Sequence, residues 1–487
     1  MGSRDATAAP RMSPAADRSD LDADSQSMLG LFAFLLALAL ILHQLWWDGF
    51  DARHPLVMAA AAWTLLRPTS LLRFSSLLAA EVIAVWRDMP EVGDHILLVG
   101  LSGACLLGHW VASALRERCP PTAGEIWEAA APFLRASALI VYAFAALSKM
   151  NGDFLDPELS CAATMSANVT WFDPSLLGSW RVEPAIWSTI LIEATLPVLL
   201  AVRRTRGLGL VLGVGFHVVL ALAGNVPFAA VMLALYSAFL PADAPSRVRA
   251  LFAGGRASGV LERARRRPPW FDPAALLVLA AGWLLADRLA AANATLAGVL
   301  LEEVTRATVV AIAVVAAALA LATRRRGRRP ARPARSRPRI QAVFAVGIAL
   351  LAINGLSPYL GLKSATSFNM FSNLRTEPGR WNHELIPEAV RIFGAQDHLV
   401  RVVRSNDPWL QRSADDGGML VEAEVERYVR QHPYAHATVS SSDMPGPTAR
   451  APMTRISSTG AALLSTQSVI DKLAKFRPVP AEGIPGC

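Results

Sequence analysis

Long apolar stretches, separated by short polar ones, are the main feature of this chain. Between residues 28 and 356 they recur at about the length that crosses a lipid bilayer. The pattern predicts helices at 28–47, 55–67, 72–87, 95–115, 131–150, 184–202, 207–223, 226–240, 273–291, 305–323 and 340–356. The first stretch is too long for a signal peptide and lacks a cleavage context. The pattern therefore predicts an all-α polytopic membrane protein with about nine to eleven transmembrane helices.

The two ends of the chain differ from this transmembrane domain, which we place at 28–356. Residues 1–27 are polar and rich in Ala, Ser and Asp, which is typical of a disordered N-terminal tail. Residues 357–487 are also polar, with an alternating stretch from His398 to Arg404 and a helical pattern from Glu422 to Arg430. This segment predicts a small C-terminal mixed α/β domain outside the membrane.

Composition and the placement of charges agree with this topology. The chain is 53% hydrophobic and 18% charged, which is unusually apolar for a soluble protein of its size. Basic residues cluster in alternate loops, at Arg67, Arg73, Arg116, Arg118, Arg203, Arg206, Arg265, Arg267 and 324–339. Acidic residues mark the other loops, at Asp48, Asp51, Asp88, Glu91, Asp94, Asp153, Asp156, Glu158, Glu302 and Glu303. Placing the arginines in the cytoplasm predicts a multi-pass cell-membrane protein with a cytoplasmic N-terminus and an extracytoplasmic C-terminal domain. The net charge of +8 then reflects topology, and no nucleic-acid partner is needed to explain it.

The chain has four cysteines, which are too few and too scattered for a disulfide framework. No pair of Cys or His residues has the spacing of zinc ligands, so we predict no metal site. Cys161 and Cys487 both fall on the predicted outer side, where they can pair.

Lys149 is the only lysine in the first 362 residues, although the chain has 47 Lys plus Arg. It ends a strongly apolar predicted helix. A lysine in an apolar site can lose its proton near neutral pH, whereas arginine keeps its charge in proteins. A single lysine among arginines therefore indicates a role that needs a neutral amine. The alternative is an interfacial lysine whose ammonium reaches the lipid headgroups from the end of a helix.

Several polar residues fall inside predicted spans, where a charged or strongly polar group needs a partner. They are Glu81, His95, His109, Glu193 and His217. A hydrogen bond between neighbouring helices is the ordinary role of any one of them. A glutamate and a histidine on adjacent spans, together with Lys149, also suit a polar cavity inside the membrane domain.

Four short stretches resemble one family in the same order along the chain. The segment from Ile140 to Phe154, with Ser148-Lys149-Met150, resembles the lysine-bearing helix end of vitamin K-dependent γ-glutamyl carboxylase and, more broadly, the HTTM domain. The others are Gly93-Asp94-His95 at a helix start, Phe216-His217 within a span, and the segment Arg339 to Tyr359 followed by Phe368 to Ser372. Together they fall within residues 28–385.

This resemblance implies a quinol-dependent carboxylase of the lyase or ligase type. Lys149 matches the base that deprotonates a reduced naphthoquinone, either menaquinol or vitamin K hydroquinone, and His95 matches an assisting histidine. With O2 and CO2 as co-substrates, the reaction would carboxylate a glutamate-like acceptor in a peptide or protein. The candidates for lining the quinone site are Tyr142, Glu193, His217 and Tyr359.

The chain departs from the family pattern at several points, and two alternatives stay open. Ser148 precedes Lys149 where the family has a second lysine, and Asp94 stands where it has asparagine. The C-terminal domain is also much shorter than the family's substrate-binding region. One alternative is a quinone-binding membrane protein that acts on another substrate, and the other is a non-catalytic scaffold in which Lys149 is an anchor.

Overall fold

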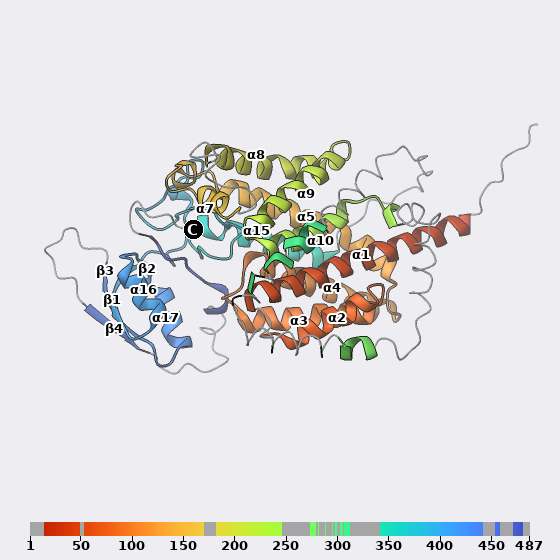
Figure 1. Ribbon diagram of the computed structural model, residues 1–487, viewed down its shortest axis with the longest axis horizontal. Helices are drawn as coiled ribbons and strands as arrows, with labels where there is room; N and C mark the ends of the chain where they lie inside the picture. The colour runs from red at the N-terminus through yellow and green to blue at the C-terminus, as the bar shows by residue number, and fades with distance from the viewer. Residues whose placement is uncertain are drawn as a thin grey trace, which may run out of the picture.

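The computed structural model describes residues 14–48, 53–169, 182–245, 341–441, 453–457 and 471–480, with short stretches between 273 and 311. Most of these residues form a bundle of helices, and a small sheet packs at one end of the bundle (Figure 1). A mostly helical fold with a small sheet formed by C-terminal residues is therefore confirmed for the described residues.

The longer helices agree closely with the apolar stretches of the sequence. They are α1 (Pro14–Asp48), α2 (Pro55–Leu66), α3 (Leu71–Asp88), α4 (Asp94–Glu117), α5 (Ala123–Ser148), α8 (Val182–Ala201), α9 (Arg206–Leu222), α10 (Val226–Tyr236) and α15 (Ala342–Leu360). Two short helices, α6 (Gly152–Leu155) and α7 (Cys161–Ala167), follow α5. The predicted helices at 273–291 and 305–323 lie largely outside the described residues, which show only short helical stretches there.

Two helices begin earlier than predicted, and local sequence explains both starts. The polar stretch predicted as a disordered tail is helical from Pro14, because proline suits the first helical turn and no glycine lies between Pro14 and Gly30. Helix α5 begins at Ala123, where Thr122 and Glu125 form a capping box. The first turns of α1 are polar, so hydrophobic periodicity alone does not detect its start, whereas the start of α5 is set by its cap.

Five described helices are long and apolar enough to cross a membrane, fewer than the nine to eleven predicted. They are Ala23–Trp47 within α1, and α4, α5, α8 and α15. Helices α2, α9 and the Val226–Phe239 segment are apolar but shorter. Helix α3 carries Arg73, Glu81 and Arg87, which explains why it falls outside this group. The difference comes from three shorter helices, from the charges of α3, and from the two predicted helices at 273–291 and 305–323 that lie largely outside the described residues.

Helices α1 and α5 organise the bundle. Helix α1 packs against α2, α5 and α10, while α5 also packs against α8 and α15. Their buried faces meet in one apolar core that includes Phe32, Leu77, Phe133, Leu134 and Phe344. Helices α8 and α9 form a pair along one side of the bundle (Figure 1).

Two glycines of α9 offer a matched test of packing. A Cβ at Gly213 would collide with the ring of Tyr236, whereas a Cβ at Gly215 would meet no atom within 4 Å. We expect Gly213→Ala to lower the free energy of unfolding by about 1–3 kcal/mol through overpacking. Gly215→Ala should be neutral or raise it by up to about 1 kcal/mol, because alanine favours helices. Thermal unfolding in detergent would compare them, and equal effects would contradict the close contact between α9 and α10.

The C-terminal domain is built on a four-stranded antiparallel sheet with the strand order β2-β1-β3-β4. The strands are β1 (Leu399–Ser405), β2 (Leu420–Val421), β3 (His436–Ser441) and β4 (Met453–Ser457). Helices α16 (Pro408–Asp415) and α17 (Glu422–Gln431) pack on the sheet around a small core of Val402, Leu410 and Val425. The predicted strand near 398–404 and helix near 422–430 are both confirmed.

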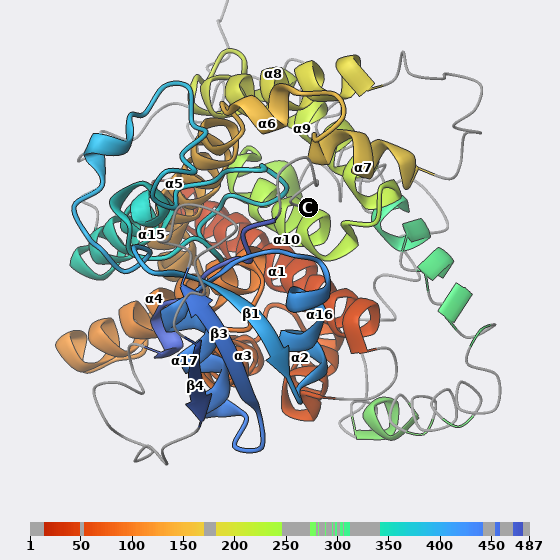
Figure 2. The same cartoon turned by 90° about the vertical axis from the view of Figure 1, so that its left-hand side faces the viewer.

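Ionic contacts join this domain to the loop between α3 and α4. Glu91 in that loop pairs with Arg427 of α17 at 2.8 Å and also with Lys475. Lys472 donates to the carbonyl oxygen of Trp86 at 2.9 Å. Viewed from this end, the sheet lies over α3 and α2, while α6, α7 and α8 lie toward the opposite edge (Figure 2). The end of α5 contacts another part of the chain, the segment between α15 and the sheet, residues 361–398.

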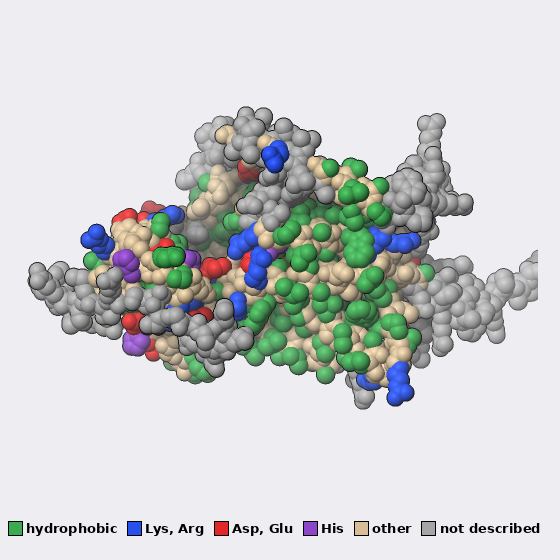
Figure 3. Space-filling view, turned by 90° about the horizontal axis from the view of Figure 1, so that it is seen from below, with side chains coloured by type: hydrophobic (Ala, Val, Ile, Leu, Met, Phe, Trp, Pro, Cys, Tyr) green, Lys and Arg blue, Asp and Glu red, His purple; other side chains and the backbone are tan. Residues whose placement is uncertain are grey.

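Apolar side chains cover much of the outer surface of the bundle. Hydrophobic side chains cover most of one face of the bundle (Figure 3). Basic side chains lie at the end away from the C-terminal domain, and side chains of both charges lie toward that domain. Large exposed examples are Leu56, Leu72, Ile83, Leu191 and Val219. Soluble monomers rarely expose so broad an apolar surface, so this surface calls for an apolar neighbour.

Candidate functional site

Lys149 lies directly after α5, as its C-cap residue. Its side chain turns inward and is only 4% exposed. The ammonium nitrogen Nζ lies 2.9 Å from Oε2 and 3.2 Å from Oε1 of Glu193, a residue in the middle of α8 whose side chain is 8% exposed. Two residues that the sequence marked separately, as a lone lysine and a glutamate inside a span, thus form one buried ion pair.

Two backbone carbonyls complete the surroundings of the Lys149 amine. Nζ donates to the carbonyl oxygen of Ala145 at 3.3 Å and to that of Met370 at 3.2 Å. It also lies 5.8 Å from the centre of the Phe154 ring, within the range of a cation–π contact. The amine is therefore held from several sides, which is not the arrangement of a lysine reaching outward to lipid headgroups.

The loop that supplies the Met370 carbonyl has an unusual backbone. Thr366, Phe368, Phe371 and Asn373 all have positive φ, between 49° and 58°. Non-glycine residues seldom occupy this left-handed region, and clusters of them occur at functional sites. The same loop reaches α4, since the Phe368 N–H donates to Oδ1 of Asp94 at 2.7 Å. It therefore connects the start of α4 with the end of α5.

Asn151 and His383 fix the chain immediately after Lys149. The Asn151 side chain donates to the carbonyl oxygen of Ser148 at 2.7 Å and accepts from the Phe154 N–H at 2.9 Å. The Nε2 atom of His383 lies 2.9 Å from the carbonyl oxygen of Leu147. Burial lowers the pKa of His383, which favours the neutral ring at this contact. The end of α5 is thus held rigidly against residues 370–384.

A cavity of about 530 Å³ opens beside the Lys149–Glu193 pair. Its wall is mainly apolar and comes from α7, α8, α9, the start of α10 and the 370–371 loop, with Phe154, Ile192, Phe216, Phe228 and Phe371 among the larger side chains. Lys149 and Glu193 are the charged residues on this wall. Such a cavity can hold a molecule with an apolar body and a polar group directed at the ion pair.

Tyr142 and His217, both predicted to line the quinone site, contact each other in the core. The Tyr142 hydroxyl lies 2.5 Å from Nε2 of His217 and is also hydrogen-bonded to the hydroxyl of Tyr236. All three side chains are buried, and none is on the wall of the cavity beside Lys149. Tyr236 was not anticipated, because an aromatic residue in an apolar helix gives no sign of such a partner.

Tyr359 lies farther away, near the end of α15. Its ring packs edge-on against His383, with 5.2 Å between ring centres, and its hydroxyl has no hydrogen-bond partner among the described residues. Because His383 contacts the end of α5, Tyr359 supports the site from behind. It does not line the cavity beside Lys149.

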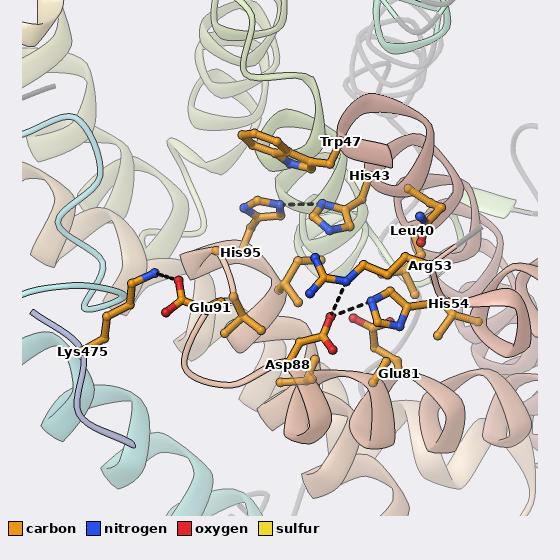
Figure 4. A pocket seen from close by; sticks show the side chains of 17 residues that line it. Leu40, His43, Trp47, Arg53, His54, Glu81, Asp88, Glu91, His95 and Lys475 are labelled. Carbon is orange, nitrogen blue, oxygen red and sulfur yellow. Dashed lines mark hydrogen bonds and ion pairs between the residues drawn. The ribbon is translucent and has the colours of Figure 1, made fainter. Parts of the chain in front are cut away.

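His95 faces a second cavity, of about 390 Å³, at the junction of α1, α3 and α4. Its Nε2 atom lies 3.1 Å from Nδ1 of His43, a residue of α1 (Figure 4). Lys149 is not among the residues that line this cavity. The helix start that carries His95 and the helix end that carries Lys149 meet the same 366–373 loop, but the two side chains do not share a cavity.

Lys363 is a further buried amine that the sequence did not single out. It follows α15 and donates to the carbonyl oxygen of Thr366 at 3.1 Å. Burial lowers the pKa of Lys363 from 10.5 to about 8, and the negative charge of Asp94 opposes part of this change. The only hint in the sequence is that Lys363 is another of the rare lysines.

This lowered pKa predicts a pH-dependent stability. Between about pH 8 and 10.5 the unfolded chain keeps the Lys363 proton while the folded chain has lost it, so stability should rise with pH. The full cost of burying the charge, about 3 kcal/mol, applies below pH 8. We expect Lys363→Met to remove this rise in unfolding experiments from pH 7 to 10.5, and Lys472→Met to retain it. A rise of equal size in Lys363→Met would contradict the assignment.

The described cysteines differ in their bonding. Cys161, at the start of α7, is disulfide-bonded, whereas Cys105 and Cys119 are free thiols. Its expected partner, Cys487, lies outside the described residues. Within the part of the chain that the structure describes, no group of three or more His, Cys, Asp or Glu residues is arranged to hold a metal ion.

Comparisons with known proteins give no family assignment. No protein-family model matches the sequence, and neither curated proteins nor solved structures gave a match.

Proposed function

We propose that this chain is an integral membrane enzyme whose cavity beside Lys149 binds a reduced naphthoquinone, with Lys149 as the base. The observation that carries the proposal is the buried Lys149–Glu193 pair on the wall of an otherwise apolar cavity. Its volume of about 530 Å³ lies within the range of small-molecule sites. The resemblance of residues 140–154 to the carboxylase helix end supports the choice of ligand.

The distribution of charge supports a membrane location. At one end of the bundle, the ends of α2, α4 and α8 and the start of α9 carry Arg67, Arg116, Arg118, Arg203, Arg204 and Arg206. The end that holds Lys149 carries more acidic residues, with Asp88, Glu91, Asp94, Asp153 and Asp156 beside Arg53 and Arg87. We therefore propose that the arginine-rich end is cytoplasmic and that Lys149 and the C-terminal domain lie on the outer side.

The proposed step requires the Lys149 ammonium of the ion pair to release one proton to solvent, which leaves a neutral amine beside the Glu193 carboxylate. Lys149 accepts the hydroxyl proton of the bound quinol, and Glu193 stabilises the ammonium ion that forms. The carbonyls of Ala145 and Met370 keep Nζ directed along the cavity wall. A bound quinol would supply the reducing chemistry with O2, and, as in the family that the sequence resembles, CO2 would be added to a glutamate-like acceptor.

The proposed step does not use His95, which lines a different cavity. Tyr142 and His217 lie behind the wall and support Phe216 and Phe228, which line the site: the His217 ring centre lies 5.3 Å from that of Phe228. The proposal thus keeps Lys149 and Glu193 from the predicted residues and gives the others supporting positions.

The test uses the full chain purified in lipid nanodiscs. We expect a naphthoquinone in organic extracts of the protein, and oxygen uptake with epoxide formation when reduced menaquinone is added. Incorporation of labelled CO2 into a glutamate peptide would establish carboxylation. Bound quinone without CO2 incorporation would indicate a different substrate, whereas no bound quinone and no oxygen uptake would leave a scaffold or another reaction.

A further inference from the structure

The second cavity, between α1, α3 and α4, has a mixed wall with many more polar side chains than the cavity beside Lys149. It lies at the end of the bundle that faces the C-terminal domain, and Lys475 of that domain contributes to its wall. Figure 4 shows His43 and Trp47 from α1, Glu81 and Asp88 from α3, and His95 from α4 around it. Its volume, about 390 Å³, is enough for a small organic molecule.

The charged groups on this wall are not evenly matched. Arg53 pairs with Asp88 at 3.3 Å, and Lys475 pairs with Glu91. His54 also contacts Asp88, at 2.8 Å. Glu81 is the third carboxyl group on the wall, and among the described residues no hydrogen bond or ion pair is found for its side chain. Arg53 and Lys475 are thus paired with Asp88 and Glu91, which leaves Glu81 as the carboxyl group on this wall without a basic partner.

Glu81 is deeply placed as well as unpaired. The residue is 4% exposed and lies seven positions before the end of α3 at Asp88, or roughly 10 Å along the helix axis. A buried carboxyl group without a partner costs free energy, and a bound group that donates a hydrogen bond or carries positive charge would offset that cost. The cavity gives such a group access to Glu81.

The remaining wall residues favour a cation of organic type. Trp47 is 66% exposed and presents an indole ring, which attracts ammonium groups through its π face. His43 and His95 are hydrogen-bonded to each other, and within the described residues no set of ligands suits a metal ion. An anion is disfavoured, because Arg53 and Lys475 already have carboxylate partners.

We propose that this second cavity binds a small organic ammonium ion, with the charged nitrogen beside Glu81 and the carbon body toward Trp47. Entry is from the outer end of the bundle, where Lys475 and Trp47 lie. This inference concerns a site separate from the one beside Lys149 and does not depend on quinone binding there.

Isothermal titration of the full chain in nanodiscs tests the site with butylammonium chloride as the probe. Butanol and butyrate serve as the uncharged and anionic controls, and empty nanodiscs measure partitioning into lipid. We expect saturable binding of butylammonium that butanol and butyrate do not share. Binding of butanol as tight as that of butylammonium, or no saturable binding of butylammonium, would overturn the proposal.

Three variants locate the binding. Glu81→Gln keeps the shape of the side chain but cannot form a carboxylate, and should weaken butylammonium binding at least tenfold. Glu158→Gln changes an exposed carboxyl at the same end of the bundle and should leave it unchanged. Trp47→Leu, at an exposed position that tolerates substitution, should weaken binding about threefold. Unchanged affinity in both Glu81→Gln and Trp47→Leu would place the ammonium elsewhere and refute the site.

Discussion

Replacing Lys149 with arginine is expected to reduce quinol-dependent oxygen uptake by about 100-fold or more, since a general base contributes about 10²–10⁴ to a rate. Arginine can keep the ionic contact with Glu193, but it cannot act as a base near neutral pH. The variant therefore separates loss of the base from loss of the ion pair. Oxygen uptake and epoxide formation with reduced menaquinone would measure the effect in purified protein.

Two controls make this result specific. Lys472→Arg changes a lysine that donates to the Trp86 carbonyl at the C-terminal domain, and it should retain full activity. The amount of quinone extracted with Lys149→Arg should stay close to that of the unmodified protein, which would show that the cavity remains intact. Full activity in Lys149→Arg would mean that Lys149 serves only to hold the helix end through Glu193.

Much of the fold could be predicted because its helices are long and uniformly apolar. Helices α4, α8 and α9 follow the predicted ranges within a few residues. The early start of α1 depends on polar first turns and that of α5 on its capping box, and periodicity detects neither. The short helices α6 and α7 depend on side-chain caps from Asn151 and Ser160. Local caps therefore set the helix starts and the short helices, whereas the lengths of the apolar stretches set the number and order of the long helices.

The candidate site was predictable only in part, for a different physical reason. Lys149 and Glu193 stood out because charged groups are rare in apolar segments, and the structure brings them together. The Met370 carbonyl could not be anticipated, because a backbone acceptor has no signature in the side-chain sequence. His95 also shows that the position of a residue along a helix does not give the direction of its side chain. It lies at the start of α4, near the 366–373 loop, yet its side chain points to His43.

The two cavities share one structural theme, which is a carboxyl group buried within a helix. At Glu193 a lysine provides the opposite charge, and the pair lies on an apolar wall. At Glu81 the side chain has no such partner among the described residues, and the wall around it mixes polar and apolar side chains. A carboxylate with a lysine suits proton transfer from a hydroxyl group, whereas an unpaired carboxyl suits recognition of a cation.

The Lys149–Glu193 pair should also be visible in stability. Glu193→Leu leaves the Lys149 amine buried without its carboxylate and is expected to lower the free energy of unfolding by about 3–5 kcal/mol. Lys149→Met should cost less, because the Glu193 carboxyl can take up a proton. The double variant should recover much of the loss, since replacing both members of a buried ion pair by apolar side chains is often neutral.

Unfolding of the four proteins in detergent gives the coupling between the two residues, which we expect to be about 2–3 kcal/mol. A coupling near zero would contradict a close, dry ion pair and would imply that water separates the two groups. The quinone content and the oxygen uptake of the double variant separate ligand binding from chemistry. If that protein is stable, retains quinone and shows no oxygen uptake, then the apolar wall provides binding and the Lys149–Glu193 pair provides the chemistry.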